Sequence, residues 1–244
     1  MEYQPEFKTF KKIIKKEKSY IIYTTLVADL DTPVSAMLRI GGNEPYSFLL
    51  ESVEGGEAKG RYSILGLQPD LIWRCYGNNA EVNYDPENSL NKFKKENHKT
   101  LDSIRLLVEN SKIKLPENLP PMASGLVGYL GYDTIKLVEN IPSNNPSKLN
   151  LPDGMFVRPK VMIIFDAVED TMTIITPVYL KDNKINNYNK IYKKSCKIID
   201  NIVKLLKQPI ENKHLTYKKV KKNEKIKSNF KKSEYIKIVN KAKK

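Results

Sequence analysis

The stretch from Pro45 to Leu67, PYSFLLESVEGGEAKGRYSILGL, decides how this sequence is interpreted. An apolar strand is predicted up to Glu51, Ser52 follows it, and a second strand begins at Arg61. Polar side chains therefore lie where two predicted strands meet. A carboxylate can accept an ammonium group, a hydroxyl can donate and accept, and a guanidinium pairs with carboxylates. The segment is a candidate binding site for a small zwitterion.

This segment has two other interpretations. Gly55 and Gly60 have the spacing of a phosphate-binding loop, but such a loop continues with lysine and a hydroxyl residue into a helix. Here Arg61 and Tyr62 follow and a strand pattern resumes, so a phosphate-binding loop is excluded. An apolar run that ends in turn residues is also typical of any buried strand leaving a core, and that interpretation stays open on these residues alone.

Two further motifs lie far from the first. Residues 125–133, GLVGYLGYD, space three glycines through a predicted strand. Glycine within a strand marks a bulge or the close approach of another backbone or a ligand, and we favour the packing role over direct ligand binding. Residues 228–235, SNFKKSEY, open a predicted helix that continues towards the end of the sequence at Lys244.

These segments resemble the large subunit of anthranilate synthase, component I, a chorismate-binding enzyme. The first resembles its N-terminal region, the glycine motif with its continuation to Pro142 resembles the Gly-Tyr-Leu-Gly-Tyr-Asp stretch, and residues 228–235 resemble the entry into the catalytic domain. The resemblance covers nearly the whole chain. It implies that Glu51 and Ser52 contact L-tryptophan as a feedback effector, with Arg61 as a further basic partner.

The resemblance also implies the chemistry of the longer enzyme. Component I aminates chorismate with ammonia that a glutamine amidotransferase subunit, component II, delivers, and pyruvate is eliminated to give anthranilate. Chorismate, Mg²⁺ and the catalytic acid and base would be held by a C-terminal catalytic half that lies beyond Lys244. We therefore expect no catalytic residue and no metal ligand in this chain, no activity from it alone, and the catalytic half as a partner.

Two alternatives remain open. One is a stand-alone amino-acid-binding regulatory domain without catalysis, and the other is the large subunit of the related para-aminobenzoate synthase. The run ESVEGGE followed by GRYS favours anthranilate synthase over the latter.

Composition limits the broad class of the protein. A chain of 244 residues with 40% hydrophobic content can bury a substantial core. The two cysteines, Cys75 and Cys196, and the histidines His98 and His214 lack the spacing of a zinc site or a disulfide framework, which favours a reducing, cytoplasmic setting. The sequence shows neither a signal peptide nor a window of membrane-spanning length, so we expect a soluble protein without a membrane partner.

The net charge of +14 is concentrated at one end of the chain. Residues 181–244 hold 21 lysines and 5 acidic residues, so the preceding residues are together close to neutral. The lysine-rich part contains no arginine and few aromatic residues, which base recognition favours. We interpret it as a solvated helix face and a linker, and we expect no nucleic-acid partner.

The residue patterns predict an α+β fold with mainly antiparallel sheets in a sandwich-like arrangement and a few flanking helices. The helices are expected over residues 100–109 and 188–206. The expected strands are 19–28, 45–51, 61–67, 70–76, 80–84, 125–133, 157–168 and 172–179, with a tight turn at Gly77 to Asn79. The predicted domains are a regulatory domain over 1–212, a lysine-rich linker over 213–227 and the start of the catalytic domain over 228–244.

Overall fold

A computed structural model describes residues 1–42, 44–51, 60–142, 149–180, 187–210 and 227–243 of the protein. Contacts divide the chain into two compact units, Met1–Ile210 and Glu211–Lys244. The second unit contains helix α5 (Lys232–Ala242), none of whose side chains is buried.

The helices of the first unit are α1 (Phe7–Glu17), α2 (Pro33–Ile40), α3 (Thr100–Asn110) and α4 (Tyr188–Leu206), with 3-10 turns η1 (Pro121–Ala123) and η2 (Tyr132–Leu137). Its strands are β1 (Ser19–Val27), β2 (Phe48–Leu50), β3 (Tyr62–Tyr76), β4 (Asn79–Asn83), β5 (Lys94–Lys95), β6 (Val127–Leu130), β7 (Gly154–Asp166) and β8 (Thr171–Tyr179).

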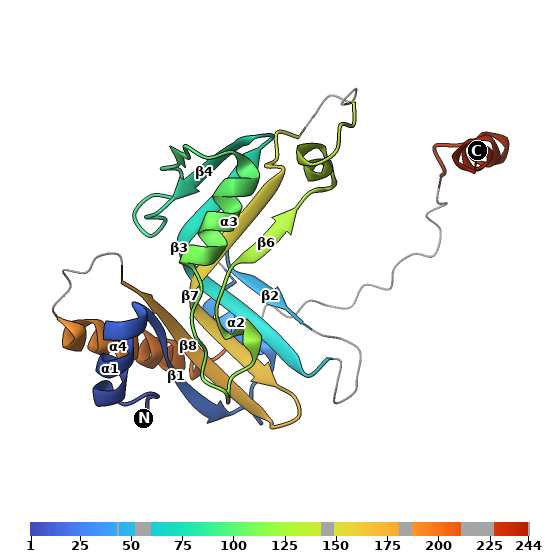
Figure 1. Ribbon diagram of the computed structural model, residues 1–244. Coiled ribbons are helices and arrows are strands. Elements are labelled where there is room, and N and C mark those ends of the chain that lie inside the picture. The colour runs from blue at the N-terminus through green and yellow to red at the C-terminus, as the bar shows by residue number, and fades with distance from the viewer. Residues whose placement is uncertain (43, 52–59, 143–148, 181–186, 211–226, 244) are drawn as a thin grey trace. The chain divides into compact units, whose positions relative to one another are not determined.

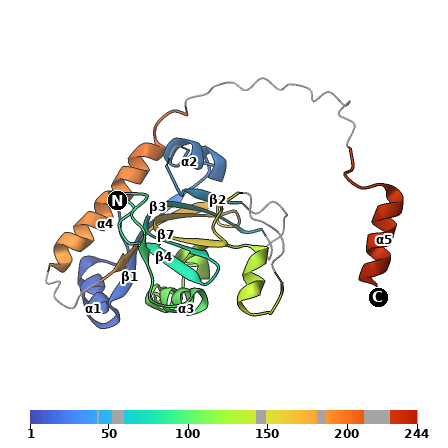
Figure 2. The same cartoon turned by 90° about the horizontal axis from the view of Figure 1, so that it is seen from above.

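The described strands form one antiparallel sheet of eight strands in the order β1-β8-β7-β3-β4-β5, with β2 beside β3 and β6 beside β7. The long strands β3 and β7 pair along almost their whole length and make the curved centre of the sheet (Figure 1). The predicted α+β class with antiparallel strands is confirmed. Helices α2 and α4 cover one face of this single curled sheet, and α3 covers the other (Figure 2).

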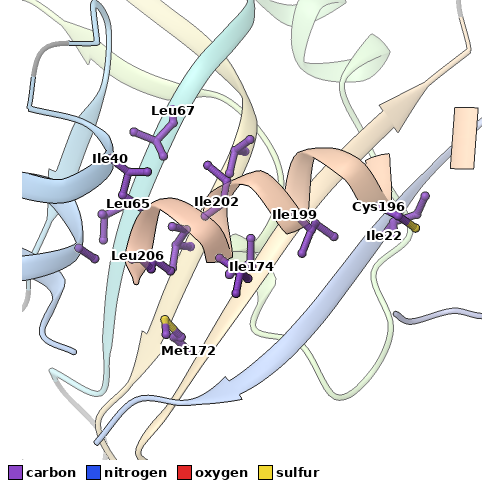
Figure 3. Packing of buried hydrophobic residues seen from close by; sticks show 14 of the residues in the cluster. Ile22, Ile40, Leu65, Leu67, Met172, Ile174, Cys196, Ile199, Ile202 and Leu206 are labelled. Carbon is purple, nitrogen blue, oxygen red and sulfur yellow. The ribbon is translucent and has the colours of Figure 1, made fainter. Parts of the chain in front are cut away.

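The larger core lies between the sheet and α4. Ile199, Ile202 and Leu206 recur along one stripe of α4 and point at strand residues such as Leu65 and Ile174 (Figure 3). Burying an isoleucine or leucine side chain contributes about 1.5 to 3 kcal/mol. The lysines of α4 occupy its outer face, so the helix is held by an apolar stripe within a strongly basic sequence.

The opposite face of the sheet packs against α3. Trp73 is fully buried there, and its indole N–H donates to Ser103 Oγ over 2.9 Å. A buried indole needs such a partner because an unmet polar group costs free energy. Leu107 of α3 joins the same cluster, which fixes the helix against the end of the sheet formed by β3 and β4.

A β-bulge at Asp70 reverses which side of the sheet the alternating side chains of β3 point to. Pro69 pairs with Pro159 and Leu71 with Arg158, so β3 has one residue more than β7 at this point. The carboxylate of the extra residue accepts from Arg158 Nε over 2.7 Å and from Nη2 over 2.9 Å. Arg158 is buried and stacks on the ring of Tyr179 at 3.9 Å, so the bulge is fixed by a compensated charge.

The glycines of the 125–133 motif allow strands to pack closely. A Cβ on Gly128 would lie 1.9 Å from the carbonyl oxygen of Met155, which no side chain can tolerate. A Cβ on Gly131 would lie 3.0 Å from the oxygen of Asp153. The motif thus places β6 directly against β7, which is the packing role favoured from the sequence.

Most predicted elements are present with small shifts of their ends. The hairpin around Gly77, the β7–β8 pair and helices α3 and α4 are confirmed. Residues 61–67 and 70–76 form one strand where two were expected, because the bulge at Asp70 carries β3 past Pro69. The glycine strand ends at Leu130 and continues as η2. Helices α1 and α2 were not predicted.

The described helices include none that is long and apolar enough to cross a lipid bilayer.

Candidate functional site

The predicted binding residues gather at one end of the β2–β3 pair. Leu50 of β2 pairs with Ile64 of β3, so Glu51, which follows β2, and Arg61, which precedes β3, lie at the same end of this pair. Glu51 is exposed. Ser52 lies outside the described residues. The structure therefore brings two of the three predicted residues to the same end of the β2–β3 pair.

Arg61 is held by the turn that joins β7 to β8. Its Nε donates to Asp166 Oδ1 over 2.8 Å and its Nη2 donates to Asp166 Oδ2 over 2.6 Å. Glu169 contributes a second, longer ion pair of 3.7 Å to Nη2. The two parallel hydrogen bonds are the arrangement that a planar guanidinium makes with a carboxylate.

Asp166 also orders the turn itself. Its Oδ1 accepts from the backbone N–H of Val168 over 3.0 Å and of Glu169 over 3.3 Å. The N–H of Ala167 donates to the carbonyl oxygen of Arg61 over 2.9 Å. The backbone and the side chain of Arg61 are thus both fastened to this turn, which places the start of β3.

The pairing changes the titration of both groups. The hydrogen bond from Arg61, with two backbone N–H groups, lowers the pKa of Asp166 below its ordinary value. The hydrogen bond from Asp166 raises the pKa of Arg61. Both groups are therefore charged throughout the physiological range. In the described part of the chain, Arg61 Nη1 makes no hydrogen bond, so that side of the guanidinium is the one able to bind a further acceptor.

A cavity of about 340 Å³ lies beside this pair. This volume is at the lower end of the range for small-molecule sites. Thr25 and Thr173 share a hydrogen bond of 3.0 Å between their hydroxyls in its wall. Its lining includes Thr25, Arg61, Tyr62, Asn118, Asp166, Glu169, Thr171 and Thr173. Hydroxyl, amide and guanidinium groups can together bind a polar ligand, and Glu51 is not part of this lining.

Sequence reasoning missed the acidic partner of the site. The strand pattern places Asp166 within the expected strand 157–168 and gives it no partner, because Arg61 is 105 residues away and no local pattern links the two. Asn118 and the threonines of β1 and β8 come together only through the sheet.

No group of three or more Asp, Glu, His or Cys side chains that could hold a metal ion occurs within the described ranges. The carboxylates that the structure describes therefore do not fit a Mg²⁺ site.

The sequence profile of the chorismate binding enzyme family matches residues 46–244. The chain belongs to this family. The matched range includes β2, the Arg61–Asp166 pair and the glycine motif, whereas Thr25 of the cavity wall precedes it.

The chain is homologous to anthranilate synthase component 1. The protein of that name from Cereibacter sphaeroides is 42% identical over 174 residues, which cover 71% of this chain and 35% of the relative. The one from Synechocystis is 32% identical over 208 residues, covering 84% of this chain and 40% of the relative. The crystal structure of anthranilate synthase component I from Streptococcus pneumoniae TIGR4 matches with a TM-score of 0.44 and 20% identity, over 73% of this chain and 36% of that chain. The chain thus spans less than half the length of the relatives it matches.

Proposed function

We propose that this chain is the tryptophan-sensing N-terminal part of an anthranilate synthase component I. The observation that carries the proposal is the 42% identity to a protein named anthranilate synthase component 1 across 71% of this chain. Membership of the chorismate binding enzyme family supports the same substrate class. The whole enzyme would convert chorismate and ammonia into anthranilate and pyruvate in tryptophan biosynthesis.

The chemistry at the end of the β2–β3 pair supports an amino-acid effector. Glu51 offers an exposed carboxylate to an ammonium group. Arg61 offers its Nη1 side to a carboxylate while Asp166 holds Nε and Nη2. Ser52, which stands between the two in sequence, would supply a hydroxyl. We propose that L-tryptophan binds to Glu51 and Ser52, with Arg61 as a further basic partner.

The other roles in the proposal are divided between partner polypeptides and the two ends of this chain. A glutamine amidotransferase subunit, component II, would deliver ammonia in the cytoplasm, and the C-terminal catalytic half would bind chorismate and Mg²⁺. Residues 1–212 would form the regulatory domain and 228–244 would open the catalytic domain. The proposed linker, 213–227, lies almost wholly outside the described residues.

A chimera tests this function. The 244-residue chain would replace the matched segment of the Cereibacter sphaeroides relative, and anthranilate formation from chorismate and ammonia would be followed by fluorescence. We expect activity in the chimera, inhibition of that activity by L-tryptophan, and no activity from the chain alone. Tight tryptophan binding by the chain alone, without activity in the chimera, would indicate a stand-alone sensor.

A further inference from the structure

A second cavity, of about 350 Å³, lies between the first half of α4, the end of β8 and the turn that follows β4. We call it the α4–β8 cavity. Its volume is at the lower end of the range for small-molecule sites. Lys160 of β7 lines it, whereas Asp166, six residues further along the same strand, lines the cavity at Arg61. Six strand residues span about 20 Å, so the two cavities are separate sites.

One face of α4 forms the helical wall of the α4–β8 cavity. Residues three, four and seven positions apart share one face of a helix. The two isoleucines of this face, with Pro177 of β8, give the cavity an aliphatic wall. The residues of α4 that line it follow this spacing and are Ile191, Lys194, Ser195 and Ile198.

Ser195 places an unused hydroxyl in this wall. The residue is only 6% exposed, and its hydroxyl makes no hydrogen bond to any residue that the structure describes. Among the described residues, no fully enclosed side-chain nitrogen or oxygen lacks a partner, so the oxygen of Ser195 is still reachable from the cavity. A hydroxyl both donates and accepts, and leaving it unmet in a buried wall costs free energy. Ser195 is therefore available to a ligand.

Several other polar groups of the wall are already used within the protein. Asp70 accepts two hydrogen bonds from Arg158, and Lys160 forms an ion pair with Glu87. The hydroxyls of two further lining residues donate to backbone carbonyl oxygens, namely those of Thr176 and Tyr179. These groups shape the cavity but leave little capacity for a ligand.

One positive and one negative charge in the wall have no opposite charge beside them. Lys194 makes no ion pair with any residue in the described ranges. Asp85 Oδ1 accepts from the side-chain amide of Asn88 over 2.8 Å, and no cation within the described part of the chain pairs with this carboxylate. A carboxylate can accept about four hydrogen bonds, so Asp85 can bind a further donor. A ligand that carries both an ammonium and a carboxylate group matches this arrangement better than a simple anion or cation.

We propose that the α4–β8 cavity binds a free amino acid with an aliphatic side chain. The ligand carboxylate pairs with Lys194 and accepts from the Ser195 hydroxyl, and the ligand ammonium group pairs with Asp85. The aliphatic side chain packs against the two isoleucines of α4 and Pro177. The inference goes beyond the proposed function, because this site uses none of the residues proposed to bind tryptophan and does not depend on tryptophan inhibition.

Three probes of matched shape test the proposal on the 244-residue chain. L-leucine carries both charges, isocaproate lacks its ammonium group, and isoamylamine lacks its carboxylate. Each would be titrated up to about 10 mM while the backbone amide resonances of the isotope-labelled chain are recorded. We expect L-leucine to shift the resonances of Ser195 and Asp85 and to leave those of Arg61 and Asp166 unchanged. Isocaproate and isoamylamine should bind at least about ten-fold more weakly, because each loses one charge-assisted contact.

Two of these results would overturn the proposal. One is the absence of shifts at Ser195 and Asp85 with L-leucine. The other is an isocaproate or isoamylamine affinity equal to that of L-leucine, which would show that a single charge is recognised.

Matched substitutions locate the site. The lining variants Lys194→Gln and Asp85→Asn have as controls Lys197→Gln and Asp102→Asn, at exposed positions outside the lining. The lining variants should bind L-leucine about ten-fold more weakly, and the controls should bind it as the native chain does. Equal losses in a variant and its control would overturn the assignment.

Ser195→Ala separates binding from stability. The hydroxyl makes no hydrogen bond within the described residues, so its removal should leave the thermal unfolding midpoint unchanged. Binding of L-leucine should weaken about five-fold, because the contact to the ligand carboxylate is lost. Unchanged affinity for L-leucine in Ser195→Ala would contradict the role of this hydroxyl.

Discussion

Asp166 holds Arg61 by two hydrogen bonds, 2.8 Å long from Nε to Oδ1 and 2.6 Å long from Nη2 to Oδ2. Arg61 directly precedes β3, which follows the predicted effector segment, and Asp166 is the last residue of β7 before the turn to β8. The charge of Arg61 is therefore compensated within the domain. An effector carboxylate would bind to Nη1, the nitrogen of Arg61 that Asp166 does not use. The main role of Arg61 is then structural, because it fixes the start of β3.

The pairing predicts a measurable coupling between the two residues. Arg61→Ala and Asp166→Ala should each lower the free energy of unfolding, because each leaves a charge without its partner. The double substitution should cost less than the sum of the two single substitutions. Denaturant unfolding of the four proteins measures this, and additive losses would show that the pair contributes nothing.

The same pair predicts a pH dependence in acid. Because Arg61 holds the folded pKa of Asp166 below its ordinary value of 3.8, the stabilisation is complete above that value. It is lost as the pH falls through the lower folded pKa. The difference in unfolding free energy between the native protein and Asp166→Asn should therefore shrink as the pH is lowered from about 6 to about 2, the range in which carboxylates become protonated. A difference that stays constant across that range would contradict the assignment.

The bulge residue Asp70 should be far more sensitive to substitution than an exposed ion pair. Asp70→Ala leaves Arg158, which is 6% exposed, without its carboxylate, and a buried uncompensated charge costs about 3 to 5 kcal/mol. The control is Glu81→Ala, which removes the partner of Arg74 from a pair whose side chains are 28% and 32% exposed. That loss should stay within about 1 kcal/mol. Equal losses in thermal or denaturant unfolding would show that Arg158 finds another partner.

The glycine motif predicts a steric effect. Gly128→Ala would place a Cβ 1.9 Å from the oxygen of Met155, so β6 has to move away from β7. Overpacking of this kind costs about 1 to 3 kcal/mol. Gly42→Ala is the matched control, because its Cβ would meet its nearest neighbour at 3.7 Å, an ordinary contact. Loss of stability only in Gly128→Ala is expected, and two equally stable variants would contradict the close packing.

Local patterns predicted much of this fold. The hairpin at Gly77 needs a positive φ angle, which glycine adopts readily. The apolar stripe from Tyr188 to Leu206 identifies the buried face of α4 from the local sequence alone. Helix α1 carries a similar signal, since Phe10 and Ile14 are four residues apart and fully buried within a lysine-rich segment.

Long-range pairs could not be predicted. Arg61 meets Asp166 across 105 residues, and Arg158 meets Asp70 across 88, because strands β3 and β7 run side by side. Nothing in either local sequence specifies the register that brings them together. The bulge at Asp70 was likewise not predicted, and residues 61–67 and 70–76 were expected as two separate strands. The candidate site was therefore predicted as a set of polar residues on one segment, without the partner that holds Arg61.

The central claim is that this chain senses tryptophan for a catalytic part that lies elsewhere, and the inhibition constant of L-tryptophan in the chimera tests it most directly. Ser52→Ala, which removes only the hydroxyl, should weaken inhibition about ten-fold, since an unmet hydrogen-bonding group costs about 1 to 3 kcal/mol. Ser52→Phe, which also fills the space, should abolish inhibition while anthranilate formation is largely retained. An inhibition constant that is unchanged in Ser52→Phe would contradict the account.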